Sequence, residues 1–550
     1  MMNPNAIATS NPHDFFLPMR VFQKRIQQVP IIVNVSNFII NRINNGLQVD
    51  FSDMEVLKFW EDRSGQVIAA TGAGKTMMFS AILYLVTKYI RDNNLNVQSR
   101  NILIATPWIA LNAQTETEII NNIKKIDSDY AGLKYLKIFI QDSSEGRSSN
   151  YSNIFHASSY ANSFTTVDNF ASETPDNEFS IVICCNKSLP RVNGIKFLFA
   201  IADEAHRING GVETNKLWFD NVKSGVYLYF TATRTISASI IHNMENSEKY
   251  GTILGVISYQ TAFNEGWILK PEFYCGDASK IRFVENYSTS TKKKVSALLD
   301  ETLHIVPKHE EFVSTKGGTK HKLLIAADKA FACLDAITNW EEYSFGGKYL
   351  VFVAISRTPA MAEIEGSGPT IYAVNGKIIK SREDWLRLIH LCRNCIIFNY
   401  DIFKEGIDIP SLTAVIVCRN LTDNKVAMIQ YAGRSFRIDT GCEYMNTCAG
   451  DLEILGNNID TSANPYKVPQ ILYISELGSP FFDEGYVKTK VFESENYGYH
   501  GMDIVVDGGA TGTNKEQKEL ELLIADRDWM ELHGVIRGKT EVVIEDDYEF

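Results

Sequence analysis

The sequence predicts an α/β fold with two tandem lobes, each built on a mostly parallel sheet, followed by a smaller C-terminal extension. Short apolar runs that suit buried strands alternate with helical patterns from about residue 65 to 235, and a second series begins near residue 321. This alternation is typical of strand–helix–strand units in which helices cover a parallel sheet. The runs are RNILIAT, YLKIFI, FSIVICC, KFLFAIADE and GVYLYFTAT in the first series, and HKLLIAA, KYLVFVAIS, TIYAV, NCIIFN and TAVIVC in the second.

This pattern divides the chain into three predicted regions: residues 1–260 as the first lobe, residues 261–450 as the second, and residues 451–550 as an accessory region. The accessory region contains one pattern of an amphipathic helix, NKEQKELELLIADRDWMELHG. It ends on EVVIEDDYEF, which carries five carboxylate side chains and no Lys or Arg. We interpret this acidic end as a solvated tail, and the alternative is a peptide that binds a protein partner.

Composition and charge narrow the class of protein. With 45% hydrophobic and 22% charged residues over 550 positions, the chain is typical of a globular protein with several domains. Its net charge of −12 argues against a broadly basic surface, so any contact with nucleic acid must come from a local groove. Nine irregularly spaced cysteines suit a reducing interior, and no stretch approaches the roughly 20 apolar residues of a membrane span. We therefore expect a soluble intracellular protein that does not associate with a membrane.

A glycine-rich loop is the strongest local signal in the first lobe. In VIAATGAGKTMMF, residues 67–79, two glycines break an apolar run, and a helical pattern follows from Lys75. This order is that of a phosphate-binding loop, whose backbone N–H groups converge on phosphate oxygens. The first position is Ala69 and not glycine, so the pattern is relaxed, and an ordinary strand–turn–helix is the alternative. Lys75 is expected to pair with the β- and γ-phosphates, and Thr76 to hold Mg²⁺. The predicted nucleotide-binding residues of this loop are Thr71, Gly72, Ala73, Gly74, Lys75 and Thr76.

A pair of carboxylates follows another predicted strand, in IADEAHR, residues 201–207. At the carboxyl end of a strand in a parallel sheet, such side chains lie where nucleotides bind. Asp203 can hold Mg²⁺, usually through water, and Glu204 can orient and deprotonate the attacking water. By itself the pair is weak evidence, because acidic residues often end strands.

Together with further motifs in the same order, residues 18–440 resemble a superfamily 2 helicase or translocase of the DEAH-bearing branch. That branch includes restriction-enzyme motor subunits and several viral helicases. The resemblance implies two RecA-like lobes, ATP and Mg²⁺ as cofactors, and nucleic acid as the partner. The segment AFNEGWILKP, residues 262–271, is similar to the family's connector into the second lobe.

The resemblance also implies roles for further residues of the first lobe. PMRVFQ is similar to the motif whose Gln, here Gln23, contacts adenine. TPWIALNAQT resembles the motif that touches the nucleic-acid backbone, which implicates Pro107 and Gln114. TAT matches the motif that couples the nucleotide site to the nucleic-acid groove. The implied coupling residues are His206, Thr231 and Thr233.

KEGIDIP and QYAGRSFR in the second lobe resemble the family's motifs V and VI. The resemblance implies that Gly406, Asp408 and Gln430 lie near the nucleotide. Arg434 and Arg437 are three residues apart, so we expect them on one face of a helix, from which both can project across a cleft. Such a cationic fork stabilises charge on γ-phosphoryl oxygens, as arginine fingers do. Following the family, Arg437 is the predicted finger and Arg434 the predicted γ-phosphate contact.

The chain departs from the family's pattern at several positions. Tyr400 stands where motif V commonly has Thr, Cys185 replaces another Thr, and Arg234 follows TAT where Pro is usual. Two of these positions match sites where the family contacts the nucleic-acid backbone, so they put in doubt which polymer is bound. Tyr400 could still donate to a phosphate or stack on a base.

We interpret the chain as an ATP-driven DNA helicase or double-strand translocase, in which closure of two lobes on ATP moves a strand. An RNA helicase is a close alternative, because contact with the 2′-OH decides between the polymers and no residue identifies its reader. A third interpretation is an ATP-gated clamp, a subunit of a viral replication or transcription assembly that binds nucleic acid without unwinding it. The C-terminal region is the candidate site for a protein partner. Such a protein would act in the cytoplasm or nucleus, or in a host cell if it is viral.

Overall fold

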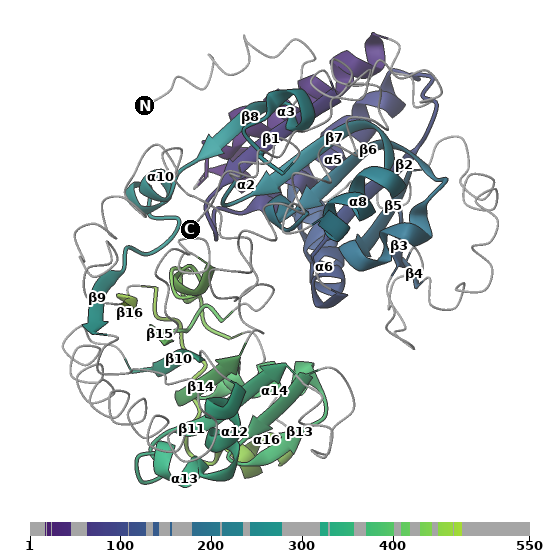
Figure 1. Ribbon diagram of the computed structural model, residues 1–550. Helices are drawn as coiled ribbons and strands as arrows, with labels where there is room; N and C mark the ends of the chain where they lie inside the picture. Colours follow the sequence, from purple (N-terminus) through teal and green to yellow (C-terminus); the bar gives the residue numbers. More distant parts are fainter. Residues whose placement is uncertain are drawn as a thin grey trace, which may run out of the picture. The chain divides into compact units, whose positions relative to one another are not determined.

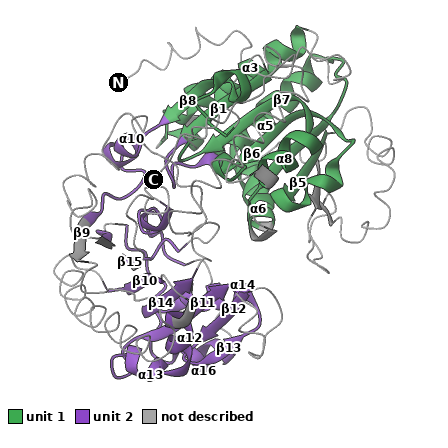
Figure 2. Ribbon diagram, viewed as in Figure 1, with its two compact units in different colours: residues 1–68, 76–256, 503–550 green, residues 69–75, 257–502 purple. Residues whose placement is uncertain are grey.

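The computed structural model describes residues 17, 19–23, 25–45, 63–107, 109–127, 136–141, 154–156, 179–208, 212–234, 242–277, 319–327, 330–356, 370–400, 409–418, 430–442, 449–465 and 467–475. The chain divides into two compact units (Figure 2). The first comprises residues 1–68, 76–256 and 503–550, and the second comprises residues 69–75 and 257–502. The predicted helix near the C-terminus and the acidic tail lie outside the described residues.

An eight-stranded sheet is the framework of the first unit (Figure 1), with the order β4-β3-β5-β2-β6-β7-β1-β8. Every neighbouring pair from β4 to β1 is parallel. Strands buried on both faces of a parallel sheet need continuous apolar runs, and this explains why β2 and β5 are buried at every residue. The strands are β1 (Ser64–Ala69), β2 (Asn101–Thr106), β3 (Leu136–Gln141), β4 (Ile154–His156), β5 (Phe179–Cys185), β6 (Lys196–Asp203), β7 (Lys223–Thr231) and β8 (Thr252–Ile257).

Helices that follow the strands cover this sheet. The helix after the glycine loop, α5, is apolar on nearly every face, and its residues from Met78 to Thr87 are all buried, as the sequence predicts. An edge-to-face contact of 5.8 Å between the rings of Phe79 and Phe230 joins α5 to β7. The helices of this unit are α2 (Met19–Phe22), α3 (Gln28–Asn44), α5 (Lys75–Asp92), α6 (Ile109–Ile126), α8 (Val212–Asn221) and α9 (Ser247–Tyr250), with 3₁₀ turns at Asn186–Val192 and Ala205–Arg207.

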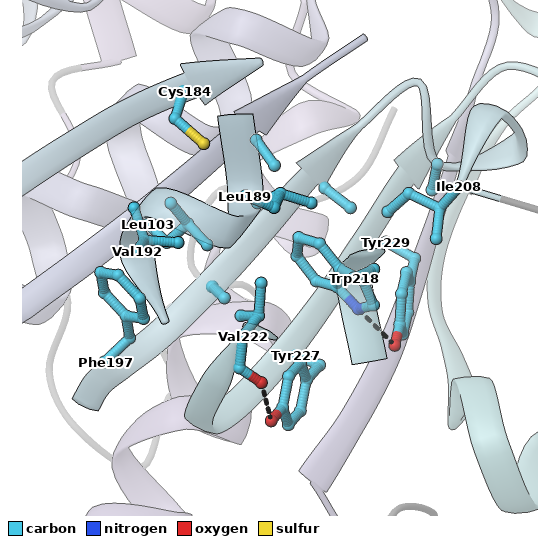
Figure 3. Close-up of a cluster of buried hydrophobic side chains, with 14 of the residues drawn as sticks. Leu103, Cys184, Leu189, Val192, Phe197, Ile208, Trp218, Val222, Tyr227 and Tyr229 are labelled. Atoms are coloured by element: carbon cyan, nitrogen blue, oxygen red, sulfur yellow. Dashed lines mark hydrogen bonds between the residues drawn. The ribbon is translucent and has the colours of Figure 1, made fainter. Parts of the chain in front are cut away.

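A cluster of buried hydrophobic side chains, which includes aromatic rings of β7 and α8, packs around β7 (Figure 3). Trp218 of α8 donates its indole N–H to the hydroxyl of Tyr229 at 3.4 Å. The hydroxyl of Tyr227 donates to the carbonyl of Val222 at 3.0 Å and accepts from the amide of Ser224 at 3.0 Å. Burial raises the pKa of both tyrosines, so the hydroxyls stay neutral. The cluster thus buries large rings while it satisfies their polar ends, and this fixes β7 in place.

The sequence prediction does not include α3 or the edge strands β4 and β8 of the first unit. A Cβ added at Gly255 of β8 would lie 2.6 Å from Ile31 of α3, so glycine allows the helix to pack closely on the strand. The side-chain amide of Asn34 donates to the carbonyl of Leu254 at 2.6 Å. The strand is partly exposed along most of its length, and it therefore lacks the continuous apolar run that marks the inner strands.

The second unit contains another eight-stranded sheet, with the order β13-β12-β11-β14-β10-β15-β16-β9. Its pairs are parallel from β11 to β9, whereas β12 is antiparallel to both β11 and β13. Two α/β units with mostly parallel sheets confirm the predicted fold class. The strands are β9 (Glu272–Asp277), β10 (His321–Ala327), β11 (Leu350–Ser356), β12 (Thr370–Val374), β13 (Lys377–Ile379), β14 (Asn394–Tyr400), β15 (Ala414–Cys418) and β16 (Gln470–Ser475).

The last strand of this sheet, β16, lies beyond residue 450, where the sequence places the accessory region. The division of the chain at residues 260 and 450 stays a prediction.

In the core of the second sheet the ring of Tyr343 lies 4.8 Å from that of Phe398, and the hydroxyl of Tyr343 donates to Asp335 at 2.6 Å. The helices of this unit are α10 (Tyr259–Asn264), α12 (Ala330–Thr338), α13 (Trp340–Tyr343), α14 (Arg382–Leu391) and α16 (Ala449–Leu455).

Two buried lysines hold the amino end of β10 in the second sheet. The ammonium of Lys320 lies 3.0 Å from the carboxylate of Asp439, and the two side chains are only 1% and 2% exposed. Lys320 also donates to the carbonyl of Ser462. The ammonium of Lys322 donates to the carbonyls of Ile389 at 2.6 Å and of His390 at 3.1 Å. Each ammonium thus meets several oxygens, as a charge removed from water requires.

Across the part of the chain that the structure describes, no helix combines the length and the apolar character that a membrane crossing needs.

The buried ion pair makes a prediction about stability. Asp439→Asn preserves the shape of the side chain but removes the negative charge facing Lys320. We expect the free energy of unfolding to fall by about 3–5 kcal/mol, the usual cost of leaving one charge of a buried pair uncompensated. Urea denaturation of wild type and variant measures this change.

Asp92→Asn is the matched control, because its pair with Lys88 leaves side chains 42% and 46% exposed. Its effect should stay below about 1 kcal/mol. Equal effects of the two substitutions would contradict a special role for the buried pair.

Candidate functional site

The acidic pair, the TAT motif and the glycine loop all lie at the carboxyl ends of neighbouring parallel strands in the first sheet. Phe230 of β7 pairs with Asp203 on one side and with Val67 on the other. The next residue, Thr231, pairs with Ile68. Because these strands are parallel, the acidic pair, the TAT motif and the loop after β1 all follow at the carboxyl edge.

The loop between β1 and α5 has the backbone of a phosphate cradle. Gly72 and Gly74 have φ angles of 84° and 85°, a conformation that glycine adopts without steric cost. The amide of Ala73 donates to the carbonyl of Ala70 at 2.9 Å and closes the turn. Lys75 begins α5, so the N–H groups of the first helical turn follow directly after the glycine turn. This arrangement fits the phosphates of a nucleotide.

Side chains from the second unit, to which residues 69–75 belong, lie close to the loop. A Cβ added at Gly72 would lie 2.8 Å from Cγ2 of Ile268 and 3.9 Å from Cγ of Arg437. The stem of Arg437 is therefore near the glycine loop. Tyr259 also contacts this loop through Thr71, and the sequence analysis did not identify Tyr259 as a site residue.

The backbone of Glu204, the second residue of the acidic pair, is strained. Asp203 is the last residue of β6, and Glu204 has φ 49° and ψ 51°, the left-handed conformation. This conformation costs a side chain other than glycine about 1–2 kcal/mol. The amide of Glu204 donates to Oδ1 of Asp203 at 3.0 Å and stabilises the turn. The strain turns two neighbouring carboxylates away from the regular alternation of a strand, as is common at functional sites.

His206 joins the acidic pair to the TAT motif. Its Nδ1 lies 3.0 Å from Oγ1 of Thr231 and 3.6 Å from Oε2 of Glu204. The hydroxyl of Thr231 donates to the carbonyl of Thr233 at 2.6 Å and accepts from the amide of Thr233 at 3.1 Å. Because a hydroxyl has one proton, and Thr231 uses it on that carbonyl, Nδ1 of His206 must be the donor to Thr231. The imidazole therefore carries its proton on Nδ1.

The segment after β2 is also held by side-chain hydrogen bonds. The hydroxyl of Thr106 donates to Oδ1 of Asn112 at 2.6 Å. The side-chain amide of Gln114 donates to the carboxylate of Glu118 at 2.7 Å. Pro107 is buried and Gln114 is half-buried. The roles of Pro107 and Gln114 toward nucleic acid stay predictions.

Gln23 is exposed, in the turn that follows α2. Its neighbour Phe22 is buried, and the carbonyl of Phe22 accepts from the amide of Arg25 at 2.8 Å. The turn is thus anchored while the Gln23 side chain faces solvent. Its contact with adenine stays a prediction.

The two arginines do not share a helical face, so that expectation is wrong. The helical residues that include Gln430 end at Ala432, and Arg434 lies in a turn. The amide of Arg434 donates to the carbonyl of Tyr431 at 3.2 Å, and the hydroxyl of Ser435 donates to the carbonyl of Ala432 at 2.9 Å. These bonds close the turn and end the helix before either arginine. Arg434 is 9% exposed, whereas Arg437 is partly exposed.

The remaining predicted residues of the second lobe are only partly described. Tyr400 ends β14, is half-buried and pairs with Ile355 of β11. Gly406 and Asp408 lie outside the described residues, as does the rest of the segment from 401 to 408.

Comparisons with known proteins agree with this arrangement. Residues 32–236 match the family described as Type III restriction enzyme, res subunit. That segment contains the glycine loop, the acidic pair and the TAT motif. No curated protein sequence is significantly similar to this chain.

Solved structures resemble the chain at low identity. The ATP-dependent Type ISP restriction-modification enzyme LlaBIII, solved bound to DNA, is 14% identical with a TM-score of 0.48; the match covers 92% of this chain and 33% of the enzyme. A putative HsdR subunit of a type I restriction enzyme from Vibrio vulnificus YJ016 is 12% identical with a TM-score of 0.45, over 86% of this chain and 67% of the fragment. The DEAD-box helicase Mss116, solved with single-stranded RNA and UDP-BeF, is 14% identical with a TM-score of 0.43, over 91% and 85%.

This chain spans about a third of the length of the first of these relatives. The match of residues 32–236 to the family described as Type III restriction enzyme, res subunit, confirms the expected resemblance to the superfamily 2 helicases and translocases.

Proposed function

We propose that this protein is an ATP-dependent translocase or helicase that acts on DNA. The observation that supports this most directly is the register of β6, β7 and β1, which brings the acidic pair, the TAT motif and the glycine loop to one edge of a sheet. Members of the family that matches residues 32–236 are ATP-hydrolysing motors. The description of that family as a restriction enzyme subunit favours DNA over RNA.

The chain offers a complete set of groups for ATP with Mg²⁺. Backbone amides between Thr71 and Thr76 and the ammonium of Lys75 hold the phosphates. Gln23 contacts adenine, and Gly406, Asp408 and Gln430 complete the nucleotide site. Among the described residues no three His, Cys, Asp or Glu side chains cluster as metal ligands. Mg²⁺ needs only one or two protein groups beside water and phosphate, and Thr76 and Asp203 would hold it, Asp203 through water.

The bound nucleotide supplies a γ-phosphoryl group for transfer to water. Glu204 orients that water and accepts its proton. Lys75, Arg434 and Arg437 stabilise the negative charge that spreads over the γ-phosphoryl oxygens, with Arg437 as the finger. The imidazole of His206 packs beside Glu204, with Nδ1 3.6 Å from its Oε2, while the Nδ1–H donates to Thr231.

Coupling to nucleic acid uses the neighbouring side chains. A movement of Glu204 on hydrolysis shifts the adjacent imidazole of His206, which is hydrogen-bonded to Thr231, and Thr231 in turn is hydrogen-bonded to Thr233. Pro107, Gln114 and Tyr400 contact the nucleic-acid backbone in this proposal. Because backbone phosphates dominate such contacts, binding should weaken with salt and depend little on base sequence.

The first test is whether nucleic acid stimulates the ATP hydrolysis of the protein. We expect single- or double-stranded DNA to raise steady-state turnover of the purified chain above its basal rate, and to do so more than single-stranded RNA. Lys75→Ala provides the blank, because without the ammonium the phosphates lose their positive partner. Turnover equal to that of the blank would reject the ATPase. Stimulation by RNA alone would identify an RNA helicase, and basal turnover without stimulation by any polymer would favour a clamp.

Glu204→Gln separates nucleotide binding from hydrolysis. The amide keeps the size of the side chain but cannot accept a proton, so ATP should bind while turnover falls by about 10²-fold or more. Equilibrium binding of a fluorescent ATP analogue and single-turnover hydrolysis measure the two steps. Loss of ATP binding in this variant would show that Glu204 has another role.

Arg437→Ala and Arg434→Ala test the assignment of the finger. Removal of an arginine finger typically costs about 10³-fold in turnover or more, so we expect a loss of this size for Arg437→Ala. Steady-state turnover at saturating ATP is the measurement. A loss near tenfold for Arg437→Ala, with a larger one for Arg434→Ala, would transfer the role to Arg434.

A further inference from the structure

Tyr259 makes two hydrogen bonds to the glycine loop. Its hydroxyl accepts from the amide of Thr71 at 3.1 Å and donates to Oγ1 of Thr71 at 2.9 Å. Both residues belong to the second unit, although 188 positions separate them in the sequence. Together the two bonds fix both the backbone and the side chain of Thr71, and they hold the loop just before Gly72.

Tyr259 is itself fixed by its local structure. It is the first residue of α10, the short helix between the two sheets in the sequence (Figure 1). The preceding Ser258 is the N-cap, and its hydroxyl accepts from the amide of Thr261 at 2.7 Å. The Tyr259 side chain is 2% exposed. The hydroxyl therefore reaches Thr71 from a rigid base.

The ring of Tyr259 belongs to a cluster of three aromatic side chains. Its centroid lies 6.1 Å from that of Phe436, with the planes at 86°, and 6.1 Å from that of Phe263. Phe263 and Phe436 lie 5.5 Å apart at 66°. The two pairs that include Phe436 are edge-to-face, and such contacts are directional as well as apolar, so they orient the rings as well as burying them.

Phe436 connects the aromatic cluster to the segment that contains Arg434 and Arg437. It lies between Arg434 and Arg437, and it is fully buried. Its carbonyl accepts from the amide of Leu269 at 2.6 Å, next to Ile268, which packs against the Gly72 position. The connector after α10 therefore touches the glycine loop at one point and the arginine segment at another.

We propose that Tyr259 is a positioning residue that holds the glycine loop in register with the arginine segment through its hydroxyl on Thr71 and its ring on Phe436. This inference rests on the proposed ATPase function. Its physical basis is that packing of the three rings needs no hydroxyl, because phenylalanine would fill the same space. The hydroxyl adds an anchor for Thr71, and the loop is thereby ordered before nucleotide binds.

The two halves of the side chain should then have separable effects. Loss of the hydroxyl loosens the loop, so it should weaken nucleotide affinity while the arginines keep their place. Loss of the ring contact with Phe436 should disturb the arginines, and it should lower turnover more than affinity. A purely structural role would lower stability and leave no such division between binding and turnover.

The experiment begins with Tyr259→Phe in the full chain without nucleotide. Hydrogen–deuterium exchange with mass spectrometry should show faster exchange in peptides covering residues 70–74, because the Thr71 amide has lost its acceptor. In the same variant the KM for ATP should rise by up to about tenfold, because the strength of two ordinary hydrogen bonds is the upper limit for the lost ordering of the loop, with kcat changed by less than about twofold. Unchanged exchange and unchanged KM would overturn the proposal.

Phe436→Leu tests the second contact. It retains an apolar side chain but removes the edge-to-face pair, and we expect kcat to fall by more than KM changes. A double-mutant cycle of Tyr259→Phe with Thr71→Val should be non-additive, because both changes remove the same hydroxyl–hydroxyl bond. Strict additivity would mean that Tyr259 does not act through the Thr71 side chain and would overturn that step.

Tyr343→Phe is the matched control. It removes another buried tyrosine hydroxyl of the same unit, which donates to Asp335 at 2.6 Å, far from the loop in sequence. Exchange at residues 70–74 and the KM for ATP should stay at wild-type values, and a change equal to that of Tyr259→Phe would overturn the proposal. The exchange measurement needs no ATP, so failure of the ATPase in wild type is distinguishable from failure of the Tyr259 contact.

Discussion

The parallel register of β6, β7 and β1 is the constraint on which the candidate site depends. Phe230 is paired with Asp203 on one side and Val67 on the other, so the acidic pair and the glycine loop reach the edge of the sheet at almost the same level. Side chains alternate between the faces of a strand, and a slip of one residue would turn Asp203 to the other face. The buried rings of Trp218, Tyr227 and Tyr229 hold β7 against such a slip.

The backbone at this edge is shaped for the chemistry we propose. Gly72 and Gly74 adopt left-handed angles at no cost, whereas Glu204 adopts them against the preference of its side chain. That strain is tolerated because Asp203 accepts from the amide of Glu204 and His206 lies beside the carboxylate. The proton on Nδ1 of His206 then reaches Thr231, which joins a strained turn to the end of a buried strand. The candidate coupling residues His206, Thr231 and Thr233 are therefore joined by hydrogen bonds, and the candidate general base Glu204 lies beside them.

Residues 69–75 belong with the second unit, although they follow a strand of the first sheet. Three contacts explain this: Tyr259 on Thr71, Ile268 on Gly72, and the stem of Arg437 beside Gly72. The glycine loop is thus held by residues that follow β8 as well as by its own strand and helix. A loop anchored in this way has less conformational freedom to lose when it binds a ligand.

The fold class and most inner strands were predictable from the sequence, because a strand buried on both faces requires a continuous apolar run. FSIVICC and HKLLIAA coincide with β5 and β10 residue for residue, and both strands are buried at every position. The glycine loop and the acidic pair were also recognisable, since glycine spacing and strand-end carboxylates are local patterns. Only the tertiary structure decided the partly exposed strand β8, the antiparallel pairing of β12, the place of β16 in the second sheet, and the end of the helix before Arg434. The contacts of Tyr259 could not be predicted from the sequence either, because its partners Thr71 and Phe436 are distant in the chain and meet it only when the protein has folded.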